Sequence, residues 1–281
     1  MSHRRIAVGQ MTATHDVENN FRTCAKLVRD AKDRDATVLS LPECFAFIGE
    51  KDTDLLDFMR PLDSELIERY RELARTHEIW LSLGGFQEQS AVPNKALNAH
   101  LLVNATGEIV SIYRKLHLFD VDLADGTKLW ESKATEPGRA LEVCDTPVAT
   151  VGLSICYDLR FAEQYLSLRQ LGAQVLLIPA AFTAATGKAH WETLLRARAI
   201  ETQCYVAAAA QYGRHNRKRE SHGNAMIVDP WGAVIARCSD GTGIAVADID
   251  LDYVEEVRRR VPVMDHRRPE VYGHISSSRK D

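Results

Sequence analysis

Short runs of apolar, often β-branched residues alternate along the chain with longer stretches in which apolar positions recur every three or four residues. Residues 5–11, 36–45 and 79–86 have the first pattern, which predicts buried β-strands. Residues 17–34 and 63–77 have the second pattern, which predicts amphipathic helices. Strands that alternate with helices in this way indicate an α/β structure built in layers.

The same order of segments recurs in the second half of the chain. Buried strands of α/β proteins resemble one another, so a single short match carries little weight, but three matches in the same order favour two pseudo-repeated halves. Because these strands are almost continuously apolar, we expect two sheets packed face to face with helices outside. The matching segments are AVGQMTA and TVGLSIC (7–13 and 150–156), ATVLSLPECF and AQVLLIPAAF (36–45 and 173–182), and VNATGEIV and VDPWGAVI (103–110 and 228–235).

Composition narrows the class of protein. The 281 residues are 45% hydrophobic and 26% charged, which is typical of a globular protein with a sizeable core. The net charge of −4 is small and both signs are spread along the chain, so we expect neither a nucleic-acid partner nor a membrane partner. We find no signal-like or membrane-spanning run, which favours a cytoplasmic protein.

The six cysteines lack the short paired spacings of zinc sites and disulfide frameworks, so we interpret them as free thiols in a reducing compartment. No linker rich in proline, glycine or serine divides the chain. We therefore expect one domain over residues 1–261, followed by a C-terminal arm and tail over 262–281 whose last residues are disordered.

Three chemically capable side chains stand at the ends of predicted strands, where α/β sheets place ligands. Glu43 follows one strand, Lys115 a second and Cys156 a third. Taken singly, each has a simpler explanation: a solvated loop acid, a surface charge and a small buried thiol. Glu43 nevertheless lies in the apolar segment LPECFAF, and a buried carboxylate requires a partner.

The three side chains form a coherent chemical set. A thiol with a pKa of about 8.5 needs a base before it can attack a carbonyl at neutral pH, and Glu43 is such a base. The Lys115 ammonium and the backbone N–H of Tyr157 are suitable donors to the oxyanion that this attack creates. The sequence thus predicts a Glu-Lys-Cys triad for nucleophilic catalysis.

The segments LPECFAF, YRKLHLFD and SICYDLRF, in this order, resemble the three signature segments of the nitrilase superfamily of carbon-nitrogen hydrolases. The resemblance implies a four-layer α-β-β-α sandwich, with Glu43 as general base, Lys115 as oxyanion stabiliser and Cys156 as nucleophile. It also implies a fourth glutamate on the loop after the lysine segment. Glu131 is our candidate for this position, and Glu136 is a weaker one.

Within the superfamily, the stretches ARAIETQCY, GRHNRKRE and VDPWGAVIARC are similar to the Nit branch. This resemblance implies an amidase that releases 2-oxoglutarate and cysteinylglycine from deaminated glutathione, and an ω-amidase acting on 2-oxoglutaramate is the alternative. A basic loop at 214–219 suits a substrate with two carboxylates, although a solvated charged loop explains it equally well. Arg160 either binds a substrate carboxylate or holds Glu163 or Asp158 in place. The candidate substrate-binding residues are Tyr157, Arg160, Phe182, Thr183 and Arg214.

This chemistry requires no cofactor and no metal. The resemblance implies a homodimer or a higher even homo-oligomer, with the C-terminal arm reaching toward the partner. A catalytically silent interaction protein of the same fold is a second alternative. Because no member of the predicted triad is missing, we rank it low. A papain-like protease and a zinc hydrolase are disfavoured, since neither the CGSCW context nor an HExxH motif occurs.

Overall fold

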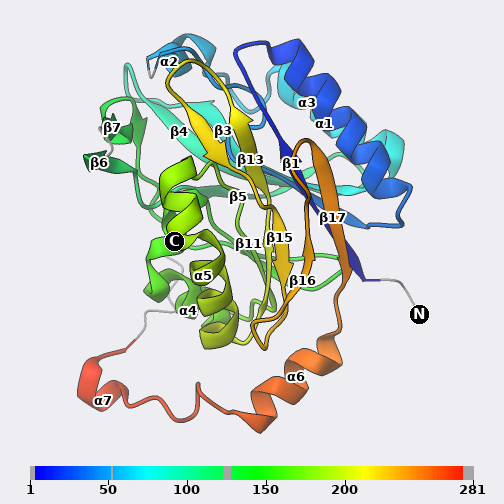
Figure 1. Ribbon diagram of the computed structural model, residues 1–281, viewed down its shortest axis with the longest axis vertical. Coiled ribbons are helices and arrows are strands. Elements are labelled where there is room, and N and C mark those ends of the chain that lie inside the picture. Colours follow the sequence, from blue (N-terminus) through cyan, green and yellow to red (C-terminus); the bar gives the residue numbers. More distant parts are fainter. Residues whose placement is uncertain (1–3, 52, 123–127, 275–281) are drawn as a thin grey trace.

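The computed structural model describes residues 4–51, 53–122 and 128–274, and its strands form two large sheets (Figure 1). In the described residues the first sheet has nine strands in the order β14-β13-β1-β2-β3-β4-β5, with β17 also paired to β1 and β8 to β4. Their bounds are β1 Arg5–Met11, β2 Val38–Leu41, β3 Trp80–Gln89, β4 Ala96–Val103, β5 Ile109–Arg114, β8 Thr135–Glu136, β13 Ala210–Arg214, β14 Glu220–His222 and β17 Gly243–Asp248.

The second sheet has six strands in the order β16-β15-β12-β11-β10-β9 over the same described ranges, and β6 and β7 form a separate small ladder. The bounds of these strands are β6 Asp120–Asp122, β7 Lys128–Trp130, β9 Val143–Asp145, β10 Thr150–Leu153, β11 Val175–Leu177, β12 Tyr205–Ala208, β15 Met226–Val228 and β16 Val234–Arg237.

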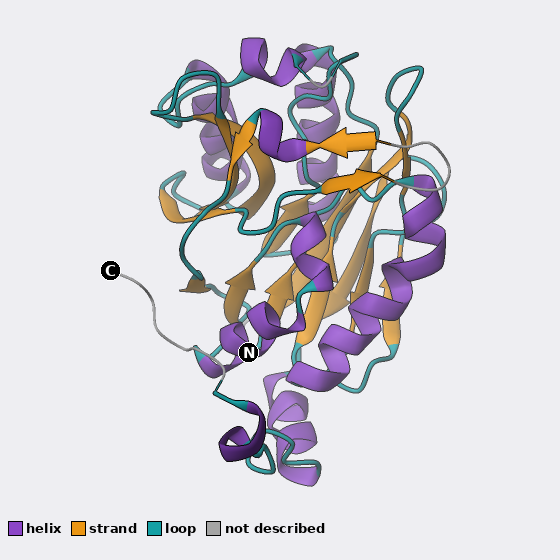
Figure 2. Cartoon of the chain, turned by 90° about the vertical axis from the view of Figure 1, so that its left-hand side faces the viewer, coloured by secondary structure: helices purple, strands orange, loops and turns teal. Residues whose placement is uncertain are grey.

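Helices cover the outer faces of the two sheets. Figure 1 shows α1 and α3 on one side of the strands and α4 and α5 on the other, and in Figure 2 the second group crosses in front of the strands. The helices are α1 Val17–Lys32, α2 Asp54–Phe58, α3 Glu65–His77, α4 Ala162–Gln170, α5 Ala184–Thr202, α6 Leu251–Arg260 and α7 Pro269–Tyr272, with 3₁₀ turns η1 Glu131–Lys133 and η2 Cys156–Arg160. The predicted α-β-β-α sandwich is confirmed.

Strand β1 shows why the apolar runs are continuous. Ile6 and Val8 belong to the core between the two sheets. Ala7 and Met11 belong to a second core beneath α1 and α3. Successive side chains of a strand point to opposite faces, so a strand covered on both faces needs apolar residues at every position.

The topology of the two sheets confirms the pseudo-repeat. In the first sheet β1, β2 and β3 are parallel and continue into the antiparallel pair β4 and β5. In the second sheet β10, β11 and β12 are parallel and continue into the antiparallel pair β15 and β16. The three matched sequence pairs fall on β1 and β10, on β2 and β11, and on the turns between the antiparallel strands.

The chain crosses between the sheets after β12. Strand β12 lies in the second sheet, but β13, which follows Ala209, pairs in parallel with β1 of the first. Strand β14 then folds back on β13 as a hairpin. This crossing, which the repeat pattern did not predict, places the basic loop of residues 214–219 beside the first half of the molecule.

The C-terminal arm expected after residue 261 includes the short helix α7, and the predicted disordered end lies outside the described residues. Among the helices of residues 4–51, 53–122 and 128–274, none is long and apolar enough to cross a membrane.

Candidate active site

Three buried side chains converge at one edge of the sandwich. Glu43 follows β2, Lys115 directly follows β5, and Cys156 begins η2 just after β10. Strand β4 is antiparallel to both β3 and β5, so β2, β3 and β5 all end at the same edge of the first sheet. The exposed fractions of Glu43, Lys115 and Cys156 are only 4%, 2% and 8%.

Cys156 occupies a tight turn. Its φ of +50° lies in the left-handed region that non-glycine residues rarely adopt, and such strain is concentrated at functional sites. The backbone N–H of Cys156 donates to the carbonyl of Pro179 over 2.9 Å. The turn therefore presents the thiol just after β10 and ties the backbone of Cys156 to the segment that follows β11.

The thiol of Cys156 lies close enough to the carboxylate of Glu43 for each group to shift the pKa of the other. Burial, followed by the negative charge of Glu43, raises the pKa of Cys156 well above its usual value, although Lys115 opposes this. The thiol is thus protonated at rest, with the Glu43 carboxylate next to it. This geometry is that of a nucleophile with its base already in place.

Glu43 is ionised despite its burial. Burial alone would raise its pKa, but the nearby Lys115 ammonium, together with the hydrogen bonds from Cys156 and Lys115, lowers the pKa below the usual value. The backbone N–H of Ala181 also donates to Glu43 Oε2 over 3.1 Å. These contacts therefore fix the position of the Glu43 carboxylate and keep it ionised.

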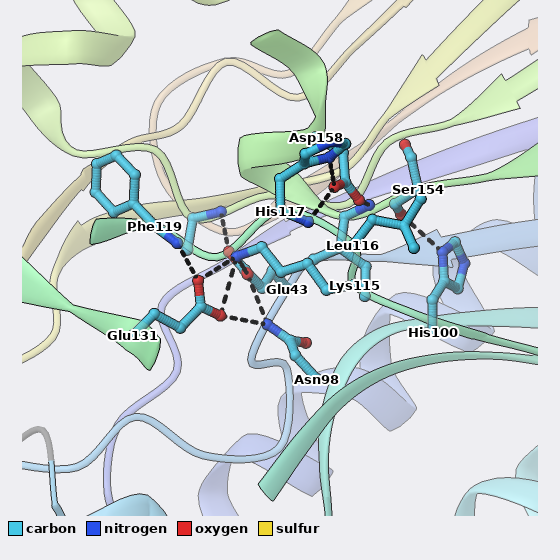
Figure 3. A network of polar contacts seen from close by, with 12 residues as sticks. Glu43, Asn98, His100, Lys115, Leu116, His117, Phe119, Glu131, Ser154 and Asp158 are labelled. Atoms are coloured by element: carbon cyan, nitrogen blue, oxygen red, sulfur yellow. Dashed lines mark hydrogen bonds and ion pairs between the residues drawn. The ribbon is translucent and has the colours of Figure 1, made fainter. Parts of the chain in front are cut away.

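Lys115 lies between two carboxylates (Figure 3). Its Nζ is 3.0 Å from Glu43 Oε1, and 3.1 and 2.9 Å from Glu131 Oε1 and Oε2. Burial by itself would lower the pKa of Lys115, but Glu131 and Glu43 outweigh it and raise the pKa well above the usual value. The side chain is accordingly a fixed cation in a buried site.

Glu131, predicted from the resemblance, indeed lies beside Lys115, and η1 carries it there. The backbone N–H of Phe119 donates to Glu131 Oε2 over 2.7 Å and orients the carboxylate. Glu136, the weaker candidate, instead lies on β8 and contacts Ser90.

Asn98 is a site residue that the sequence reasoning missed. It lies on β4, and its Nδ2 donates to Glu43 Oε1 over 3.0 Å and to Glu131 Oε1 over 3.2 Å. Both neighbours are acceptors, which assigns the amide orientation. The available signal was a pair of polar residues, Asn98 and His100, within the otherwise apolar strand ALNAHLLV.

Asp158 joins the lysine segment to the nucleophile turn. Its Oδ2 accepts from Tyr113 Oη over 2.6 Å and from the N–H of Ile155 over 2.8 Å. Its Oδ1 accepts from the N–H and Nδ1–H of His117, over 3.1 and 2.8 Å. The fully buried carboxylate thereby fixes the residues adjacent to Cys156 and close to Lys115 relative to each other.

A second polar connection crosses the interface between the two sheets at His100. Burial lowers the pKa of His100 to about 4, so its ring is neutral at pH 7. His100 Nδ1 donates to the carbonyl of Ser154 over 3.0 Å, and His100 Nε2 accepts from Ser82 Oγ over 2.7 Å. Ser154, two residues before Cys156, is thus anchored to the first sheet.

Three of the predicted substrate-binding side chains group beside the nucleophile turn. The guanidinium of Arg160 lies 5.4 Å from the ring centre of Phe182 and 5.8 Å from that of Tyr157. Its two terminal nitrogens are each 3.4 Å from His190 Nδ1. In the described part of the chain no backbone acceptor is found for the backbone N–H of Tyr157.

The other two predicted substrate-binding residues have different settings. Thr183 caps the N-terminus of α5, where its Oγ1 accepts from the N–H of Thr186. Arg214, at the end of β13, has a side chain that is 70% exposed and pairs with Glu220 over 3.4 Å. In the residues described, the structure does not bring Arg214 into contact with the Glu-Lys-Cys cluster. Within the basic loop, Arg219 is the residue whose charge contributes to the lowered pKa of Glu43.

A four-layer α-β-β-α sandwich with glutamate, lysine and cysteine buried together at one edge defines a carbon-nitrogen hydrolase of the nitrilase superfamily. The profile of the carbon-nitrogen hydrolase family matches residues 5–259, and the chain belongs to this family.

The chain is similar over nearly its whole length to proteins with established names. It is 50% identical over 274 residues to a deaminated glutathione amidase of Homo sapiens, covering 96% of this chain and 84% of that protein. It is also 50% identical over 273 residues to a deaminated glutathione amidase of Dictyostelium discoideum, covering 94% of each. The crystal structure of the C. elegans NitFhit protein has a TM-score of 0.93 and 47% identity, covering 99% of this chain and 68% of that one.

Proposed function

We propose that this protein is a cysteine-dependent amidase that hydrolyses deaminated glutathione to 2-oxoglutarate and cysteinylglycine. The observation that carries the proposal is the buried thiol of Cys156 next to the ionised Glu43, whose carboxylate accepts from the Lys115 ammonium over 3.0 Å. The half-identical relatives named for this activity support the choice of substrate.

In the first half of the reaction, Cys156 Sγ attacks the amide carbonyl of the substrate and Glu43 takes the thiol proton. The carbonyl oxygen becomes an oxyanion, which the Lys115 ammonium and the backbone N–H of Tyr157 stabilise. Glu43 then gives its proton to the departing nitrogen, so that cysteinylglycine leaves as an amine and a 2-oxoglutaryl thioester remains on Cys156.

In the second half, Glu43 takes a proton from a water molecule that attacks the thioester carbonyl. The C–S bond breaks, 2-oxoglutarate is released, and the thiolate of Cys156 recovers its proton from Glu43. Glu131 acts through Lys115. The Glu131 carboxylate and the Asn98 amide hold the Lys115 ammonium and the Glu43 carboxylate in position during both halves of the reaction.

On the substrate side, we assign Arg160, Phe182 and Tyr157 to the acyl part of the substrate. Their grouping next to Cys156 combines a cation with two aromatic faces. Thr183 begins the helix that follows Phe182 and shapes the same wall. A keto acid carries a carboxylate and a planar carbonyl, which such a wall accommodates.

The test is a comparison of Cys156→Ala with wild type on deaminated glutathione, with both products measured by mass spectrometry. Wild type should release 2-oxoglutarate and cysteinylglycine in equal amounts, and Cys156→Ala should lose at least about 10³-fold in kcat/KM. Cys144→Ala, at a half-buried cysteine of β9, is the matched control. Full activity of Cys156→Ala would exclude the scheme, and a larger kcat/KM on 2-oxoglutaramate would favour the ω-amidase alternative.

We also propose that the protein is cytoplasmic and that it forms a homodimer or a higher even homo-oligomer. Large apolar side chains are exposed on the α5 side: Ile200 is 51% exposed and Trp231 is 60% exposed. Gly232 packs directly on Ile200, so the two exposed residues belong to neighbouring surface. A mass measured by light scattering tests the assembly, and subcellular fractionation tests the location.

A further inference from the structure

A basic hollow lies between the β13–β14 hairpin and the segment that follows Glu43. It has a volume of about 680 Å³, and its walls are the β13–β14 hairpin on one side and the segment at Glu50 and Lys51 on the other. Four cationic side chains and one carboxylate line it, so its charge is strongly positive. The charged lining residues are Lys51, Arg214, Arg217, Lys218 and Glu50.

One wall of this basic hollow continues the segment that carries Glu43. Lys51 follows Glu43 by only eight residues along the chain. Asn216, at the tip of the hairpin, donates from Nδ2 to the carbonyl of Gly49 over 2.7 Å. This hydrogen bond joins the two walls of the basic hollow. In Figure 1 the hairpin accordingly rises beside the segment that leads to α2.

The other wall is connected to the site through the stem of the hairpin. His222 on β14 donates its N–H to the carbonyl of Phe182 over 2.9 Å. The carbonyl of Arg219 accepts from the N–H of His215, a lining residue, over 2.9 Å. Gln211 of β13 donates from Nε2 to the carbonyl of Glu43 over 3.0 Å, so the stem of the hairpin contacts the segment that carries Glu43.

We propose that the basic hollow binds a carboxylate carried by the leaving-amine part of the substrate, such as the terminal carboxylate of cysteinylglycine. This inference rests on the proposed function. Glu43 protonates the departing nitrogen, so the leaving part of the substrate extends to the Glu43 side, where the hollow lies. The cation nearest the nucleophile turn, Arg160, lies instead beside Phe182 and serves the acyl part.

The reach of the substrate is consistent with this assignment. A dipeptide spans roughly 7 Å in extended form, so the terminal carboxylate of the leaving part lies well away from the scissile bond. Guanidinium and ammonium groups are the usual partners of a carboxylate, and a guanidinium binds it through two parallel hydrogen bonds. A free keto-amide releases ammonia, so its leaving part has no carboxylate that could bind in the basic hollow.

The experiment compares two substrates with the same acyl part, deaminated glutathione and 2-oxoglutaramate. In the Arg217→Ala/Lys218→Ala variant we expect the KM for deaminated glutathione to rise about tenfold with little change in kcat. The kinetics on 2-oxoglutaramate should be unchanged. Arg217→Lys, which keeps the charge, should retain most of the wild-type affinity. Raising the salt concentration should raise the wild-type KM for deaminated glutathione more than the KM for 2-oxoglutaramate.

Lys26→Ala, at an exposed lysine of α1, is the control for loss of one surface charge. Equal effects of the double variant on both substrates, or an unchanged KM for deaminated glutathione, would overturn the inference while leaving the proposed function intact. Absence of wild-type activity on deaminated glutathione would instead overturn the proposed function, and the inference with it.

Discussion

Replacement of Asp158 by Asn tests whether the buried carboxylate holds the site together. Asp158 accepts four hydrogen bonds, two on each carboxylate oxygen, from Tyr113, Ile155 and His117. An asparagine has the same shape but only one acceptor oxygen. Whichever way its amide turns, the NH₂ group faces two donors, so two of the four hydrogen bonds are lost.

The cost follows from the burial of the donors. A buried donor left without a partner costs about 1–3 kcal/mol, so two of them cost about 2–6 kcal/mol of the free energy of unfolding. In a protein of this size that corresponds to a fall in Tm of roughly 5–20 °C. We also expect kcat to fall roughly tenfold to a hundredfold, because Asp158 fixes the neighbours of both Cys156 and Lys115.

The assays are thermal and urea unfolding followed by circular dichroism, with amide hydrolysis measured at 25 °C on the folded fraction. Asp240→Asn, at an exposed aspartate, is the matched control and should be neutral. Tyr113→Phe, which removes one donor, is the milder variant if Asp158→Asn does not fold. A Tm of Asp158→Asn within about 1 °C of wild type, or an unchanged kcat, would refute the reasoning.

Two further predictions concern the polar groups behind the site. Asn98→Leu removes the amide that bridges Glu43 and Glu131, so two charge-assisted hydrogen bonds are lost. We expect kcat/KM to fall about 10²-fold or more while the secondary structure stays unchanged. A kcat/KM within about twofold of wild type would contradict the role given to Asn98. Burial lowers the pKa of His100 and of His215 to about 4, with the charge of Arg219 as a second cause for His215. The unfolded chain therefore binds protons below about pH 6.5 that the folded chain does not, and the free energy of unfolding should fall by roughly 2 kcal/mol per histidine between pH 7 and pH 5. Urea titrations at the two pH values measure this loss, and equal stability at both would disprove it.

The convergence of Glu43, Lys115 and Cys156 could be predicted because each residue ends a strand, and strand ends are readable from the local apolar pattern. Glu131 followed from family resemblance, and the structure places it beside Lys115. Asn98 could not be recognised in the same way. It lies within a strand, and nothing local tells which residue of a strand faces a carboxylate on the neighbouring one.

The basic loop shows the same limit. The sequence indicated a cluster of cations at 214–219, and within it the fold places Arg214 beside Glu220 and in the lining of the basic hollow. Arg219 instead acts electrostatically on Glu43. Which member of a charged hairpin lies near the site depends on the twist and pairing of β13 and β14, and charge spacing alone carries no information about either.

The sequence by itself determined the layers, the repeat and the chemical character of the triad, because periodicity and strand termini are local properties of the chain. The tertiary structure alone decided that Asn98, Asp158 and His100 support that triad. It also decided that the β13–β14 hairpin of the second half stands against the first sheet. Both depend on strand order and register, which are set by contacts between segments far apart in the chain.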